Sequence, residues 1–154
     1  YTDHHPCVKR SKRRLGEQGR LRGVVIDVVY DHLLAKHWSS YANPSFISFI
    51  DQFHVQAMEA CTQCPRETAS FLSRLVMSGH LKRYQYFQGL EEALSRIDQR
   101  LSARVLSRES SRDYLPLIKQ ELGMIEEDFS FFMPDLITHF KSTSDPLRYD
   151  HWLK

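Results

Sequence analysis

The sequence has few of the residues that mark disulfide-rich, membrane-spanning or phosphate-loop proteins. Three cysteines in 154 residues cannot form a closed disulfide framework, and an odd number fits a reducing compartment. No apolar run approaches the roughly 18 residues of a membrane span, and no signal peptide is visible. No Gly-rich phosphate loop is present. We therefore predict a cytoplasmic protein without a membrane span.

What the sequence does contain is typical of one globular domain, with 42% hydrophobic and 26% charged residues. Apolar residues recur at helical spacing almost throughout, so we predict an all-α fold in residues 1–141 and a tail in residues 142–154. The caps and breakers predict a helix capped by Thr2 or Asp3 and ending near Gly16, then helices over Arg20–Ser39, from Ser45 to Pro65, Arg66–Gly79, Leu90–Leu106 and Asp113–Phe140, the last bent near Gly123 or Pro134.

The segment Arg20–Ser39 carries three polar groups, Asp27, Asp31 and His32, inside an apolar run. The β-branched residues of GVVIDVVY alone favour a strand, but the run continues without a turn residue into DHLLAKHW. We therefore predict a central, buried helix. Residues four apart differ by about 40° in direction around a helix, so we expect both carboxylates to face one cleft.

Two kinds of site are compatible with these three side chains. Burying a carboxylate costs several kcal/mol unless the group is paired or holds a metal. Oxygen and imidazole donors suit a divalent cation, which makes Asp27, Asp31 and His32 candidate ligands, with the rest of the shell supplied by other helices. In the alternative, both aspartates pair with arginines of neighbouring helices and His32 is a hydrogen-bonded core histidine.

A basic segment precedes this helix. Between residues 9 and 22, Glu17 is the single acid among a run of cations: Lys9, Arg10, Lys12, Arg13, Arg14, Arg20 and Arg22. Local positive charge of this kind attracts an acidic partner, whether a nucleic acid, a phosphate or an acidic protein. A solvated helix face beside a turn is the alternative.

The N-terminal part of the chain resembles the acyl carrier protein phosphodiesterases. In that family a Thr-Asp…Pro stretch leads through an arginine-rich helix to a Leu-Asp…Asp-His-Phe-Leu…His-Trp block. The corresponding positions here are Thr2, Asp3, Pro6, Asp27, Asp31, His32, Leu34, His37 and Trp38. The segment HLKRYQYFQGLEEALSRIDQRL also resembles the family's Tyr-containing segment and the amphipathic helix after it, so the resemblance covers residues 1–140.

The resemblance implies an HD-domain-like helical bundle of about six to seven helices. It also implies a phosphodiesterase that uses Mn²⁺, or another divalent cation such as Mg²⁺, to remove 4'-phosphopantetheine from holo acyl carrier protein. Asp31 and His32 would then be catalytic and bind the metal, with Asp27 as a further ligand. Because acyl carrier proteins are strongly acidic, the expected substrate-binding residues are Arg10, Lys12, Arg13, Arg14, Arg20 and Arg22, and nucleic acid is not the expected partner.

One departure from the family concerns the N-terminus. Family members begin with a further segment that supplies part of the metal site and holds an early histidine, a Gly-Asn…Asp stretch and a His-Arg…Asp stretch. This sequence opens on Tyr1 without that segment, so we expect a fragment with little activity by itself. Two other functions stay open: an HD-type hydrolase of a nucleotide, and a non-catalytic helical module whose basic segment binds nucleic acid.

Overall fold

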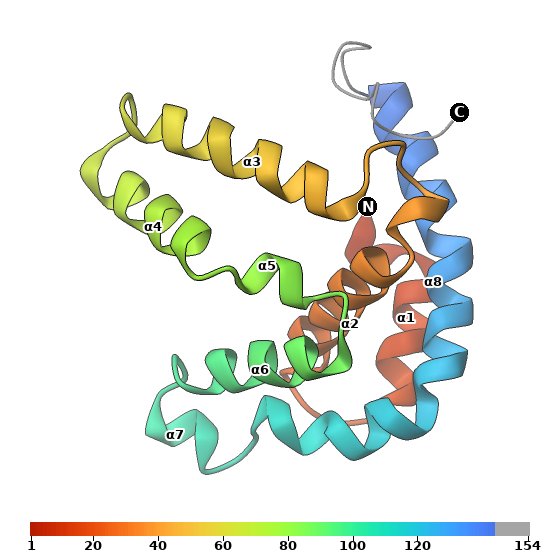
Figure 1. The fold of residues 1–154 in the computed structure, drawn as a ribbon. Helices are drawn as coiled ribbons and strands as arrows, with labels where there is room; N and C mark the ends of the chain where they lie inside the picture. Colours follow the sequence, from red (N-terminus) through yellow and green to blue (C-terminus); the bar gives the residue numbers. More distant parts are fainter. Residues whose placement is uncertain (144–154) are drawn as a thin grey trace.

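The computed structural model describes residues 1–143, which form helices and connecting turns without a β-strand (Figure 1). This confirms the all-α prediction. The elements are η1 (Thr2–His4), α1 (Pro6–Arg14), α2 (Arg22–Lys36), η2 (Trp38–Ser40), α3 (Phe46–Cys61), α4 (Arg66–Met77), α5 (His80–Arg83), α6 (Phe87–Asp98), α7 (Ala103–Leu106), η3 (Ser111–Tyr114) and α8 (Leu115–Thr143). Helices α1, α2, α6 and α8 pack together as the body, and α3 and α4 form an arm that extends away from it (Figure 1).

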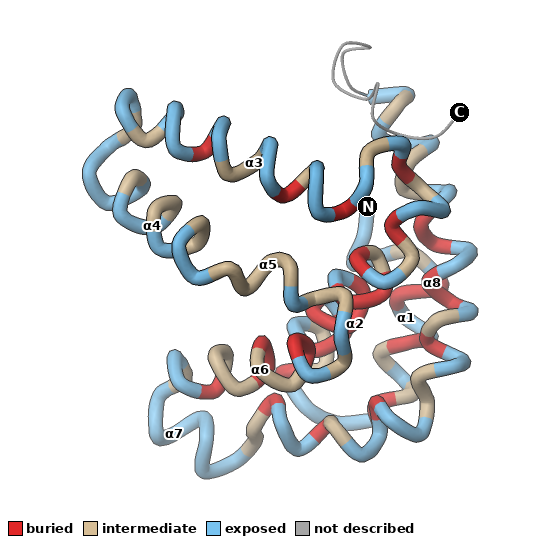
Figure 2. Tube along the Cα trace, viewed as in Figure 1, coloured by how far each residue is buried: buried red, intermediate tan, exposed pale blue. Residues whose placement is uncertain are grey.

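Helix α2 is the centre of the body, and Figure 2 shows it largely buried. More than half of its side chains are buried: Val25, Ile26, Val28, Val29, Tyr30, His32, Leu33 and Ala35. The prediction of a central helix is therefore confirmed. Burial against α1, α6 and α8 outweighs the preference of β-branched residues for strands, which mainly reflects packing context.

The start of α2 is fixed by a residue far away in the sequence. The Glu109 carboxylate accepts hydrogen bonds from the backbone N–H groups of Arg20 and Leu21, both at 2.9 Å. Gly19 allows this approach, because its φ is +118° and a Cβ there would collide with the Tyr114 hydroxyl. Helix α2 consequently begins at Arg22, not at Arg20, and it ends at Lys36, before the predicted end at Ser39.

Helix α1 begins later than predicted. Thr2 and Asp3 belong to the separate turn η1, and His5 is the capping residue of α1. The Cys7 N–H donates to His5 Nδ1 at 3.3 Å, and Pro6 occupies the first helical position, where no N–H donor is required. The predicted cap at Thr2 or Asp3 is therefore wrong.

The arm follows the predicted caps closely. The Ser45 hydroxyl accepts from the backbone N–H three residues later at 3.1 Å, and α4 ends just before Gly79, which has a φ of +63°. Helix α3 buries only Phe46, Ile50 and Ala57, and none of the residues of α4 is buried. At its base the arm joins a small cluster that contains Ala35, Trp38 and Ala42.

The predicted helix Leu90–Leu106 is divided into α6 and α7. Asp98 at the end of α6 accepts a hydrogen bond from the Ser111 N–H at 2.7 Å, so the chain loops out and returns to it. Such a contact between distant residues has no signal in the local sequence.

Figure 1 shows α8 bent in its first half, as predicted for a bend near Gly123, whereas Pro134 belongs to the second half of Leu115–Thr143. The helix continues to Thr143, two residues into the predicted tail, and residues 144–154 of that tail lie outside the described residues. In the described chain, no helix combines the length and apolar character that crossing a membrane requires.

Candidate active site on helix α2

Asp27 and Asp31 lie on the side of α2 that the body leaves exposed. Val24, one turn earlier, is 43% exposed and belongs to the same stripe. The two carboxylates thus share a side of the helix, and both lie at the surface. The arm extends away from α2 (Figure 1), and the expectation that this side of the helix faces a cleft stays a prediction.

The surroundings of both carboxyls nevertheless disfavour their charged form. Partial desolvation by neighbouring groups raises the pKa of Asp31 from 3.8 to about 6, and the charge of Asp27 adds to that rise. Desolvation also raises the pKa of Asp27, against the opposing effect of Lys12. Lys12 compensates little because its Nζ binds the Asp3 carboxylate at 2.9 Å. Asp31 thus reaches solvent, yet it is shielded enough to retain a proton near pH 6.

The alternative in which both aspartates pair with arginines of neighbouring helices is not observed. Within residues 1–143 neither Asp27 nor Asp31 forms an ion pair, and Arg10 and Arg14 of α1 pair with acids on α8. Two adjacent carboxyls with raised pKa and no paired cation are a place where a bound cation would be stabilised.

His32 lies on a different side of α2, in the core. Its Nδ1 is 2.6 Å from the Tyr84 carbonyl oxygen, and its ring packs edge-on against Phe87. Burial lowers the pKa of His32, so the neutral ring donates from Nδ1 to that carbonyl and leaves Nε2 unprotonated. As a hydrogen-bonded core residue, His32 fits the alternative set out from the sequence.

A complete metal centre is not assembled by the described residues. Between residues 1 and 143 no group of three or more His, Cys, Asp or Glu side chains is arranged to hold one ion. Asp27 and Asp31 offer carboxylates on the outside of α2, whereas His32 is directed inward, since successive residues on a helix differ by about 100°. His32 therefore lies on another side of α2 from the two carboxylates, and the joint role of the three residues as metal ligands stays a prediction.

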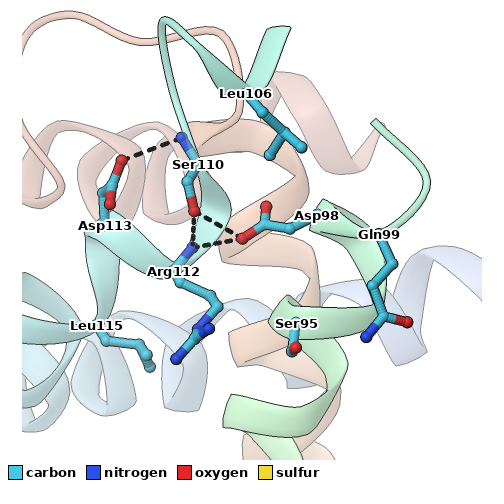
Figure 3. A pocket seen from close by; sticks show the side chains of 8 residues that line it. All are labelled: Ser95, Asp98, Gln99, Leu106, Ser110, Arg112, Asp113 and Leu115. Atoms are coloured by element: carbon cyan, nitrogen blue, oxygen red, sulfur yellow. Dashed lines mark hydrogen bonds between the residues drawn. The ribbon is translucent and has the colours of Figure 1, made fainter. Parts of the chain in front are cut away.

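A pocket of about 610 Å³ between α6, α7 and η3 contains another carboxylate, Asp98 (Figure 3). Asp98 accepts hydrogen bonds from the hydroxyls of Ser110 (2.6 Å) and Ser111 (2.7 Å) and from the Ser111 N–H (2.7 Å). Burial opposes its charge, but these bonds outweigh burial and lower the pKa of Asp98. Its acceptor capacity is used to hold η3 on α6, so we assign it a structural role.

The basic segment divides into structural and free cations. Asp128 on α8, whose side chain is 5% exposed, accepts from Arg10 Nε at 2.7 Å and Arg14 Nε at 3.0 Å. Ser11 Oγ donates to the same carboxylate at 3.2 Å. The Asp128 charge raises the pKa of the Arg10 guanidinium. Arg10 and Arg14 thus attach α1 to α8, a role that the sequence alone did not reveal.

Of the other predicted carrier-binding residues, some already have hydrogen-bond partners and some do not. Lys12 binds Asp3, and Arg22 donates to the carbonyl oxygens of Gly16 and Gly19. Arg13 and Arg20 are exposed, as is the neighbouring Lys9, and none of the three belongs to an ion pair of the described chain. These three side chains are the ones available to a partner.

A family model described as acyl carrier protein phosphodiesterase matches residues 1–136. The chain belongs to the acyl carrier protein phosphodiesterase family. Its members are hydrolases, and the family name gives acyl carrier protein as the substrate. The matched region includes all three α2 candidates and the whole basic segment. A search of curated proteins and a search of solved structures each found no match.

Tyr84 is the site neighbour that sequence reasoning missed. From the sequence, the segment around Tyr84 is assigned only a resemblance to the family's Tyr-containing stretch. In the structure, the Tyr84 carbonyl oxygen fixes the orientation of His32. The aromatic and basic residues of HLKRYQYF were the available signal, because they interrupt two amphipathic helices.

Proposed function

We propose that this acyl carrier protein phosphodiesterase removes 4'-phosphopantetheine from holo acyl carrier protein and leaves the apo carrier. The match of residues 1–136 to the family carries the proposal. The reaction adds water to the phosphodiester, breaks the bond between phosphorus and the carrier's serine oxygen, and leaves a proton on that oxygen. An exposed site suits a substrate that is attached to another protein, since the arm must reach the site from outside.

Asp31 is the residue to which we assign the central role. It is accessible, its pKa is raised to about 6, and no ion pair within the described residues neutralises it. A carboxyl with a pKa near the working pH exchanges protons efficiently with a reacting group. Desolvation is the main cause of this shift, and the negative charge of the neighbouring Asp27 adds to it.

We also propose that the reaction requires a divalent cation, Mn²⁺ or Mg²⁺, which would supply charge stabilisation at the phosphoryl group when bound. The adjacent carboxyls of Asp27 and Asp31 support this, because a cation between them would favour their ionised forms, and ionised Asp31 is the form that can accept a proton. His32 stays a predicted ligand: its unprotonated Nε2 suits the role, although its position in the core does not bring it to the carboxylates.

The acidic carrier is proposed to dock on α1, through Arg13 with Lys9 and Arg20 nearby. Opposite charges across such a contact mainly raise the association rate and weaken with salt. Arg13→Glu should raise the KM for holo acyl carrier protein several-fold and reduce its salt dependence, with kcat nearly unchanged. Arg66→Glu on the exposed start of α4 is the matched control, and equal KM values for both variants would exclude α1 as the docking surface.

The three free cysteines support a cytoplasmic setting for this activity.

The proposal is tested by following the mass of holo acyl carrier protein during incubation with the protein and Mn²⁺ or Mg²⁺. Two forms are compared: residues 1–154, and the same chain extended before Tyr1 by the N-terminal segment of a family member. We expect cation-dependent conversion to the apo carrier by the extended form, and the rate of residues 1–154 is measured beside it. Conversion that persists in excess chelator would contradict the cation requirement, and a folded extended form without any conversion would contradict the function itself.

A further inference from the structure

A second pocket, of about 580 Å³, lies between the arm and the body, and nothing above assigns it a role. It is formed by residues of α4, α5 and α6 and the turn after α5: Phe71, Arg74, Leu75, Ser78, His80, Leu81, Tyr84, Arg96 and Arg100. The lining includes three arginines and no Asp or Glu. Its volume is within the range of about 300–1,000 Å³ that is usual for small-molecule sites.

The positive charge of this basic pocket is poorly compensated within the described chain. Arg74 and Arg100 are exposed and take part in none of its ion pairs. Arg96 is 3.9 Å from Glu92, but that carboxylate is bound more closely by Arg83, at 2.8 Å. Three guanidinium groups around one hollow therefore favour an anion there, and guanidinium geometry matches a phosphate group well.

His80 adds a neutral polar contact to the basic pocket. Burial and the charges of Arg96 and Arg83 lower the pKa of His80. Arg96 donates toward His80 Nδ1 at 3.4 Å, which fits the neutral ring. The histidine thus orients Arg96 and contributes no further charge.

Three of the other lining residues are apolar. Phe71, which is 54% exposed, and the half-buried Leu75 and Leu81 provide surface beside the arginines. A free phosphate ion would use only the charged part of this pocket. A phosphate that carries an organic chain would use both parts, because the chain removes the apolar surface from water.

The basic pocket adjoins the candidate active site. Tyr84 is part of its lining, and the carbonyl oxygen of the same residue accepts the hydrogen bond from His32 of α2. The charge of Asp31 adds to the desolvation that raises the pKa of the Tyr84 hydroxyl, so this lining residue lies close enough to Asp31 to be affected by its charge. This position suits the reacting phosphate together with the chain that extends from it.

We propose that the basic pocket between α4, α5 and α6 binds a phosphate monoester with a short amide-containing chain, the class to which 4'-phosphopantetheine belongs. The proposal rests on the proposed function, in which that compound is the product. Arg74, Arg96 and Arg100 bind the phosphate, and Phe71, Leu75 and Leu81 contact the chain.

The test measures binding to residues 1–154 by isothermal titration calorimetry, with 4'-phosphopantetheine, pantetheine, inorganic phosphate and apo acyl carrier protein as separate probes. We expect 4'-phosphopantetheine to bind about tenfold or more tightly than either pantetheine or phosphate alone. The double variant Arg74→Gln/Arg100→Gln should lose this preference, and circular dichroism should show the parent helicity because both side chains are exposed. The matched control, Arg66→Gln at the exposed start of α4, should bind like the parent.

Each other result overturns the proposal. Equal affinity for pantetheine would show that the arginines do not bind the phosphate, and equal affinity for inorganic phosphate would show that the chain does not bind. A double variant that loses only the apo carrier protein would assign the arginines to protein docking. Binding is measured without turnover, so intact binding without hydrolysis would contradict only the proposed function, whereas hydrolysis with unchanged binding by the double variant would contradict only this inference.

Discussion

The body and the arm are both helical, but they differ in how completely their side chains are buried. In the body, α2 buries residues on most of its sides, and Asp128 is enclosed with its arginine partners. In the arm, α4 buries none of its residues, and apolar side chains such as Val55 (59% exposed) and Met77 (81% exposed) face solvent. The body therefore provides stability and a rigid base for Asp31, while the arm provides accessible surface next to the basic pocket.

The largest expected difference between the regions is in stability. Leu33 in α2 is fully buried, so Leu33→Ala should lower the free energy of unfolding by about 2–5 kcal/mol through lost burial and a residual cavity. Val55→Ala in the arm should change it by no more than about 0.5 kcal/mol. Urea unfolding followed by circular dichroism measures both values, and similar losses for the two variants would contradict the division into body and arm.

A smaller difference is expected for the acids of the two regions. Asp128→Asn should lower the free energy of unfolding by about 1–3 kcal/mol, because Arg10 and Arg14 lose the carboxylate that both bind and Arg14 keeps only the 3.8 Å contact with Glu121. Asp51→Asn in α3 removes an exposed partner of Lys82 and should cost at most about 1 kcal/mol. The same urea titrations test this pair. A loss for Asp51→Asn that exceeds that for Asp128→Asn would show that the exposed pair of the arm matters more.

The smallest effect concerns pH. The folded-state pKa of Asp31 is raised to about 6 from 3.8, so the native protein binds an extra proton between these two values. The stabilisation that this proton provides is complete below pH 3.8 and is lost as pH rises toward about 6. Asp31→Asn should remove this loss, and Asp51→Asn should not. Stability curves of the parent and Asp31→Asn that stay parallel across this range would show that Asp31 titrates normally.

The sequence predicted those features whose causes are local. Ser45 and Gly79 are cap signals, and the helical spacing of apolar residues around Val25 and Leu33 identified α2. The features it did not predict depend on distant partners. Glu109 sets the start of α2, Asp98 separates α6 from α7, and Asp128 engages Arg10 and Arg14.

The candidate site shows the same limit. The four-residue spacing correctly placed Asp27 and Asp31 on one side of α2, because helix geometry is local. Whether that side is covered depends on the direction of the arm, which no local pattern specifies. The basic pocket was also missed, since Arg74 and Arg96 come from different helices and meet only in the fold. The HD-like arrangement and the metal stay predictions.

The central claim is that α2 of the body, through Asp31, carries the reaction. The most direct measurement is the initial rate of apo carrier formation from holo acyl carrier protein, by mass spectrometry, for the extended form and its Asp31→Asn and Asp51→Asn variants. The account predicts that Asp31→Asn lowers kcat by at least about a hundredfold, as expected for loss of a group that exchanges protons in the reaction, while Asp51→Asn retains the parent rate. Parent-like turnover by Asp31→Asn would contradict it.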